Sequence, residues 1–189
     1  MILPGLSVDS ITKYADDVAN DYSVMTEDFT IWLFSQRNEL PAEYSVIDMA
    51  RDTAAAIRCL GLEEISLFAV SKGGMVAMTV AIQEPELVSR LILGSTAAKV
   101  NTESYQVIDY WVQLAKESKR EELCLAFGEK IYPENVFEQS KDLLIENAKS
   151  ITEEELERFV ILAEGIKGFD VKRPAGKDPM SSTGDRLPG

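Results

Sequence analysis

Apolar and polar positions over the first hundred residues alternate between short apolar runs and segments with helical spacing. The apolar runs predict four strands, at 1–3, 30–34, 65–70 and 87–94. Segments with apolar residues three or four positions apart predict the helices between them, at 10–20, 45–60 and 72–83. Because crossovers of this length join parallel strands, the pattern predicts an α/β fold: a central parallel sheet with helices on both faces.

The predicted helix over 45–60 carries recognisable signals at both ends. Ser45 and Asp48 have the spacing of a capping box, with Asp in place of the usual Glu. Gly61 follows the last apolar position and is suited to the left-handed residue that ends many helices. The sequence therefore predicts the bounds of this helix as well as its existence.

The character of the chain changes after Thr96. From 103 to 165 only helical patterns occur, and a capping box at 152–155 opens the last of them. The final stretch is rich in Pro and Gly and almost free of large apolar side chains, which predicts a flexible tail. We expect three regions: a sheet-containing core over 1–98, a helical region over 99–170 and a tail over 171–189.

Composition excludes several classes of function. The 189-residue chain has 32 acidic and 19 basic residues and a net charge of −13, which argues against a nucleic-acid partner because phosphate binding needs clustered Lys and Arg. No apolar run is long enough for a membrane span, and the first residues lack the pattern of a signal peptide. Cys59 and Cys124 lie far apart within helical patterns, so we expect buried or half-buried free thiols and a cytoplasmic protein.

The segment 65–75 is the most informative part of the chain. A buried strand ends at Ser71, and a helix begins at the next residue. Ala69 and Gly73 flank this corner, where a serine on a strained strand-to-helix turn leaves no room for bulky neighbours. The pattern predicts a nucleophilic serine, and the backbone N–H of Lys72 at the helix N-terminus is the natural first donor to a developing oxyanion.

In order and spacing, these segments resemble the α/β-hydrolase family over about residues 1–170. The segment 3–6, Leu-Pro-Gly-Leu, resembles the oxyanion loop of the family, which implies Leu6 N–H as the second donor, although a turn residue packed on the core fits Leu6 nearly as well. The helical block over 99–170 resembles the family's cap. The resemblance implies a serine hydrolase that acts on a small apolar carboxylic ester or similar acyl substrate, with Ser71 as catalytic residue and no cofactor or metal.

Two departures from the family weaken the catalytic interpretation. The chain contains no histidine, the residue that normally takes the proton of such a serine. It also resembles a family member truncated at both ends, without the first two strands and the last two. We therefore expect impaired activity at most, and a sheet with exposed edges that favour self-association.

Alternatives to a hydrolase stay open. The first alternative is a non-catalytic protein of this fold that binds a small molecule or a partner, and the second is an acyltransferase. Lys72 would replace the missing base only if burial lowered its pKa, and we expect its side chain to be solvated or at the mouth of a pocket.

The remaining candidate residues favour structural interpretations. Asp109 and Asp170 match no acid position of the family, and Arg37 is expected in a surface ion pair. Trp32 and Phe34 are expected to be core residues of their strand. No metal-ligand cluster, phosphate-binding loop or dinucleotide motif occurs in the sequence.

Overall fold

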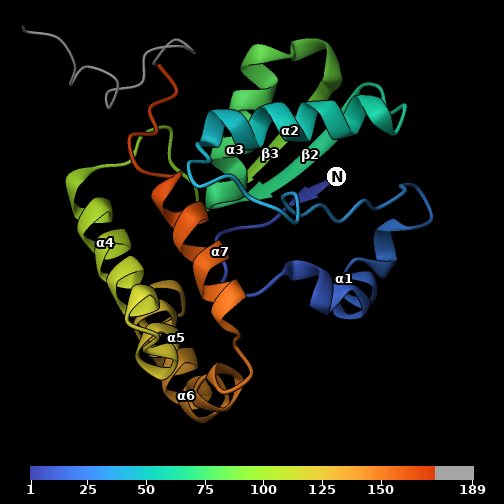
Figure 1. Ribbon diagram of the computed structural model, residues 1–189. Coiled ribbons are helices and arrows are strands. Elements are labelled where there is room, and N and C mark those ends of the chain that lie inside the picture. The colour runs from blue at the N-terminus through green and yellow to red at the C-terminus, as the bar shows by residue number, and fades with distance from the viewer. Residues whose placement is uncertain (173–189) are drawn as a thin grey trace, which may run out of the picture.

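The computed structural model describes residues 1–172, and a parallel three-stranded sheet lies at its centre (Figure 1). The strands are β1 (Ile2–Leu3), β2 (Ile65–Val70) and β3 (Val88–Gly94), in the order β1-β2-β3. Both pairings are parallel, as expected from the long crossovers.

The fourth predicted strand, at 30–34, is wrong. Within residues 1–172, its only ladder contact is a single parallel bridge between Leu33 and Ile2. Since β1 has only two residues, it offers one position for pairing on that side, and the remaining residues of the segment stay outside the sheet. Trp32 is accordingly exposed rather than in the core, whereas Phe34 is partly buried against the core.

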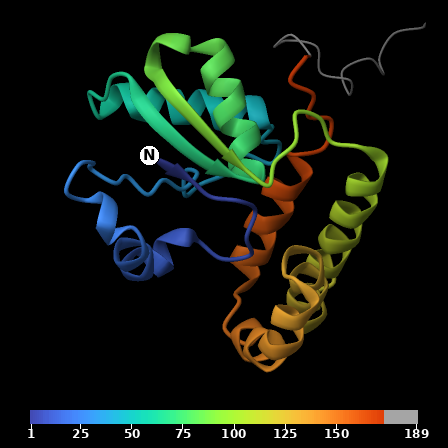
Figure 2. The ribbon, with the colours of Figure 1, turned by 180° about the vertical axis from the view of Figure 1, so that it is seen from behind.

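Helices lie on both faces of the sheet, as predicted (Figures 1 and 2). On one face α2 (Val46–Cys59) packs beside α3 (Lys72–Gln83), and the two cover the fully buried Leu67 and Ala69 of β2. Alternation along β2 directs Phe68 to the other face, where its ring makes an edge contact with Tyr22 just after α1 (Ala15–Asp21). Short 3-10 turns complete this part of the fold, at Ile11–Tyr14, Ser23–Met25 and Pro85–Leu87.

The predicted helix ends of α2 are confirmed. The backbone N–H of Asp48 donates to Ser45 Oγ, and the Asp48 carboxylate accepts from the backbone N–H of Ser45, so both halves of the capping box are present. Gly61 follows the helix with a φ of 64°. Cys59, at the last turn of α2, is exposed, so the expectation of a buried thiol is wrong there; Cys124 is half-buried.

Four helices form the region after the sheet, and they lie together below it in Figure 1. They are α4 (Thr102–Lys116), α5 (Arg120–Ile131), α6 (Glu134–Ala148) and α7 (Glu153–Glu164). The predicted capping box of Thr152 and Glu155 opens α7. The two connections to this region run side by side, since Val100 N–H donates to the Phe169 carbonyl at 3.0 Å and Val171 N–H donates to the Ala98 carbonyl at 2.8 Å.

Strand β3 is the least covered part of the sheet. Leu91, Ile92 and Leu93 are all exposed, although they form its apolar centre. The predicted tail over 171–189 lies, from residue 173 on, outside the described residues. Within residues 1–172, no helix combines the length and the hydropathy needed to cross a membrane.

Candidate active site

Ser71 occupies the corner between β2 and α3, and its backbone conformation confirms the predicted elbow. Its φ of 51° and ψ of −120° lie in a region that residues with a side chain rarely adopt, which costs about 1–3 kcal/mol. Four hydrogen bonds hold this conformation. Ser71 N–H donates to Gly94 O at 3.0 Å, and Ser71 O accepts from Gly74 N–H at 3.0 Å, from Met75 N–H at 3.3 Å and from Thr96 Oγ1 at 2.7 Å. The strain is therefore compensated by contacts from β3, α3 and the loop after β3.

The glycines after Ser71 are required by close backbone approach. A Cβ added to Gly73 would lie 2.3 Å from the carbonyl oxygen of Leu3, and one added to Gly74 would lie 2.6 Å from Thr96 Cβ. Real Cβ atoms do not come this close to other heavy atoms. Any side chain at these two positions would push the start of α3 away from the loop after β1 or from Thr96.

The loop after β1 lies directly against Ser71. A Cβ placed on Gly5 would be 3.3 Å from Ser71 Cβ and 3.9 Å from Ser71 Oγ. Leu6 is next in this loop, and its partly buried side chain packs on the core. The neighbourhood expected of an oxyanion loop is thus present, while the roles of the Leu6 and Lys72 amides belong to the proposal below.

The hydroxyl of Ser71 has no base beside it within the described residues. The structure records no hydrogen bond of Ser71 Oγ over residues 1–172, and the chain has no histidine. A serine in this setting can attack an acyl carbon only slowly unless another group takes its proton. The geometry is that of a serine at a strained strand-to-helix corner, with no hydrogen-bonded base recorded for its hydroxyl within residues 1–172.

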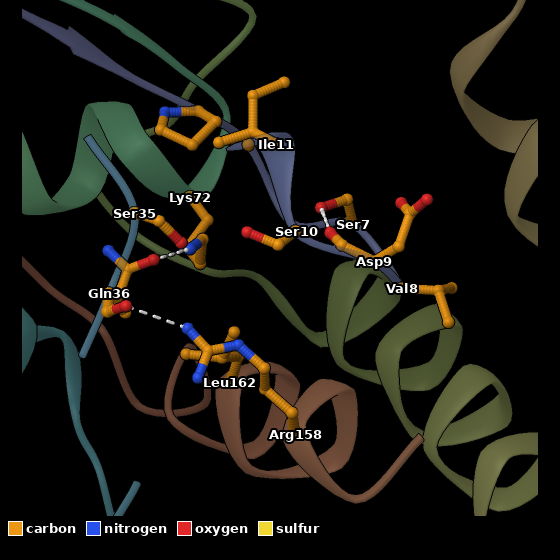
Figure 3. Close-up of a pocket in the computed structure, with 12 residues that line it drawn as sticks. Ser7, Val8, Asp9, Ser10, Ile11, Ser35, Gln36, Lys72, Arg158 and Leu162 are labelled. Atoms are coloured by element: carbon orange, nitrogen blue, oxygen red, sulfur yellow. Dashed lines mark hydrogen bonds between the residues drawn. The ribbon is translucent and has the colours of Figure 1, made fainter. Parts of the chain in front are cut away.

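The side chain of Lys72 is not solvated, which corrects the expectation from the sequence. It is only 2% exposed, and its Nζ donates to Gln36 Oε1 at 2.8 Å. Burial lowers the pKa of Lys72 to about 7, and the charge of Arg158 adds to the shift. This amine lines a small hollow to which Ser71 does not contribute, so its contacts do not support a role as the base for Ser71 (Figure 3).

Sequence analysis missed Gln36 and Arg158, which complete the surroundings of Lys72. Arg158 on α7 donates to three backbone carbonyls in the loop that follows the 30–34 segment: those of Gln36 at 3.0 Å, Arg37 at 2.7 Å and Asn38 at 3.1 Å. Residues more than 100 positions apart make these contacts, and no local pattern around either residue signals them. They attach the helical region to the edge of the sheet.

The other candidate residues occupy structural positions. Arg37 pairs with Asp52 at 3.6 Å, which confirms the predicted surface ion pair, and Tyr44 also donates to Asp52. Asp109 pairs with Lys167 in the helical region, and Asp170 lies 3.4 Å from Lys99. None of these contacts involves Ser71.

No metal site emerges from the described part of the chain, and neither of the two hollows described here is lined by Ser71. Over residues 1–172, no group of three or more Cys, Asp or Glu side chains could hold a metal ion. A hollow of about 440 Å³ lies between the 34–37 segment and α2, and Ser71 is not among its lining residues. The substrate-binding surface expected beside the serine is therefore not enclosed by these two hollows.

Comparison with known proteins settles the family. A family model described as alpha/beta hydrolase fold matches residues 4–145. The chain belongs to this family. Among curated proteins it is similar to the putative carbamate hydrolase RutD of Agrobacterium fabrum, with 28% identity over 80 residues, which are 42% of this chain and 31% of that protein.

Solved structures of α/β hydrolases share the fold. One is MGS-M2, an alpha/beta hydrolase enzyme from a Medee basin deep-sea metagenome library, with a TM-score of 0.77, 18% identity and coverage of 90% of this chain and 64% of that one. Another is the enol-lactonase of Burkholderia xenovorans LB400, with a TM-score of 0.73, 16% identity and coverage of 90% and 65%. The chain thus spans a little under two thirds of the length of these structures and about a third of the curated relative.

Proposed function

We propose that this chain carries the nucleophile and oxyanion hole of a serine hydrolase that acts on a carboxylic ester or similar acyl substrate. The strained backbone of Ser71 between β2 and α3 carries the proposal. In the proposed reaction Ser71 Oγ attacks the acyl carbonyl, and the N–H groups of Lys72 and Leu6 stabilise the tetrahedral anion. The names of similar proteins, a carbamate hydrolase and an enol-lactonase, support acyl chemistry of this class.

The proposed substrate is a small apolar acyl compound, and the helical region over 99–170 is proposed to form a cap over the serine. Both views of the ribbon support this arrangement, because the C-terminal ends of β2 and β3 lie beside α7 (Figures 1 and 2). Catalytic sites of parallel α/β sheets lie at this end of the strands.

Because the chain has no histidine, the proposed activity is a trace. An oxyanion hole and a positioned serine alone retain a modest acceleration over water. We therefore expect a turnover number well below the roughly 1–1000 per second of ordinary enzymes.

An activated ester such as p-nitrophenyl acetate tests this proposal, with imidazole added as an external base. We expect imidazole to raise the rate of the wild-type chain more than that of Ser71→Ala, since only the wild type has a nucleophile to deprotonate. Ser95→Ala is a matched control because Ser95 follows the neighbouring strand and also has a positive φ, of 45°. Equal rates for the wild type and Ser71→Ala at every imidazole concentration would refute the nucleophile.

A non-catalytic role as a small-molecule-binding protein is the second candidate. It is favoured by one observation: the buried amine next to Ser71 in sequence is bonded to Gln36 rather than to the serine. Under this alternative Ser71→Ala would leave ligand affinity and ester turnover unchanged.

We further propose that copies of the chain associate through the exposed edge of β3, and that the protein works in the cytoplasm. The exposed apolar centre of β3 supports the first part. The free thiols of Cys59 and Cys124 support the second, since such thiols persist in a reducing compartment.

A further inference from the structure

A small hollow lies behind the loop that follows β1 (Figure 3). The loop 4–11 forms one wall, Ser35 and Gln36 form the second, and Lys72, Arg158 and Leu162 close the rest. Its cavity volume is about 20 Å³, enough for a group of about the size of a water molecule. An ester substrate does not fit, so the hollow is not the proposed acyl site, although Gly5 and Lys72 adjoin both.

Two positive side chains share this hollow. Lys72 is almost fully buried, and its ammonium group has three N–H donors, of which one is directed at Gln36 Oε1. Arg158 lies near enough for its charge to act on Lys72, and its hydrogen bonds go to neutral backbone carbonyls. The negative charge of the exposed Glu154 also acts on Arg158, but Glu154 does not line the hollow.

The lining residues supply no negative charge that faces these two cations. Asp9 is the one acidic residue among them. Its carboxylate accepts a hydrogen bond from Tyr14 OH at 2.7 Å, and in Figure 3 it points away from Lys72, beyond Ser7 and Ser10. The charged residues that line the hollow are therefore Lys72, Arg158 and Asp9, and the Asp9 carboxylate is directed away from the two cations.

We propose that this hollow binds a compact monatomic anion such as chloride between Lys72 Nζ and the Arg158 guanidinium. A buried charge is costly unless an opposite charge and hydrogen bonds compensate it. The two remaining N–H donors of Lys72 can supply the hydrogen bonds, and the anion supplies the missing charge. The small volume excludes bulkier oxyanions and makes the site selective by size.

Protonation of Lys72 is linked to this binding. Without an anion, burial and Arg158 lower the pKa of Lys72 to about 7, so its charge is already partly lost at neutral pH. An anion favours the charged form, and its affinity should accordingly fall as the pH rises above 7.

Thermal unfolding of the full chain at pH 6.5 tests the proposal, with sodium chloride compared with sodium gluconate at equal ionic strength. Gluconate is too large for the hollow and controls for general salt effects. We expect saturating chloride to raise the Tm of the wild type by about 2–4 °C relative to gluconate. Such a rise supports a compact-anion site.

Lys72→Met removes the charge with little change in side-chain length, and it should abolish the specific rise in Tm. Lys149→Met is the matched control, because Lys149 is an exposed lysine of the helical region, paired with Glu146. It should keep the full rise. An equal rise in Lys72→Met, or no difference between the anions in the wild type, overturns the proposal.

A second measurement needs no variant. Wild-type crystals soaked in bromide, a heavier analogue of chloride, should show an anomalous peak within hydrogen-bond distance, about 3.3 Å, of Lys72 Nζ. Bromide peaks at the surface with none in the hollow overturn the proposal. The result is independent of ester turnover, so this site and the proposed function can fail separately.

Discussion

Strands β2 and β3 are neighbours with nearly the same apolar character and very different surroundings. They pair in register, with Leu67 opposite Leu91 and Ala69 opposite Leu93. Leu67 and Ala69 are 0% exposed, whereas Leu91 is 37% and Leu93 is 41% exposed. Sequence composition alone does not distinguish these two strands; the elements packed around them do.

The residues that follow β2 and β3 also differ in their surroundings. Each strand is followed by a serine with positive φ, Ser71 at 51° and Ser95 at 45°. Only Ser71 is followed at once by a helix, with Gly73 pressed against the loop after β1. Positive φ therefore does not distinguish the two corners. The close approach of the loop after β1 does, and it supports the proposed role of Ser71 as nucleophile.

The largest expected effect is on the free energy of unfolding, and it differs between the paired residues Leu67 and Leu91. Leu67→Ala should lower the free energy of unfolding by about 3–5 kcal/mol, because it leaves a cavity between the sheet and α2 and α3. Leu91→Ala, a chemically identical change at the paired position, should cost about 1 kcal/mol or less since solvent already reaches that side chain.

Urea unfolding followed by circular dichroism measures both values. Similar losses for the two variants would mean that Leu91 is covered in solution, which would contradict the exposed edge of β3.

The intermediate effect is on the pH dependence of the free energy of unfolding, and it comes from Lys72, the residue after Ser71. The pKa of Lys72 is about 7 in the folded chain against an ordinary value of 10.5, so the unfolded chain binds more protons between these pH values. Stability therefore rises with pH over this window. In gluconate, Lys72→Met should be more stable than the wild type by about 1–3 kcal/mol at pH 7, and the gap should narrow toward pH 10.

Urea titrations at several pH values test this, with the difference between the two chains as the readout. Other groups, such as Cys124, whose pKa burial raises to about 11, contribute equally to both chains and cancel. A gap that stays constant from pH 7 to 10 would show that Lys72 keeps its charge in the folded chain.

The smallest effect is on association at β3. Ile92→Lys places a charge on the exposed apolar edge and should weaken self-association about tenfold or more, with little change in folding stability. Val24→Lys is the control, because Val24 is an exposed apolar residue in a short turn away from the sheet. Sedimentation velocity over a range of concentrations measures the self-association of both variants. An equal effect of the two substitutions would show that the contact between copies does not involve β3.

The sequence was sufficient where local chemistry determines the structure. The capping boxes at Ser45 and Thr152 depend on residues three positions apart, and the elbow at Ser71 depends on its small neighbours, so all three could be predicted. The 30–34 segment has the composition of a strand, but its pairing depends on the length of β1, which its own residues do not encode.

The surroundings of Lys72 could not be predicted for a related reason. Its burial depends on Gln36, 36 positions away, and that loop is in turn held by Arg158, 122 positions from Gln36. A lysine at a helix start is usually solvated, so the general expectation fails where three distant segments converge.

The segments 98–100 and 169–171, which run side by side, bear on whether the helical region between them can be replaced by another. Because the helical region begins and ends at adjacent points, joined by the bridge between Lys99 and Asp170, its two ends meet. A helical module of another length can replace it, provided that its ends are equally close, without altering the path of β1, β2 and β3. Arg158 is the side chain that a replacement would have to imitate, since it ties the module to the loop at 36–38.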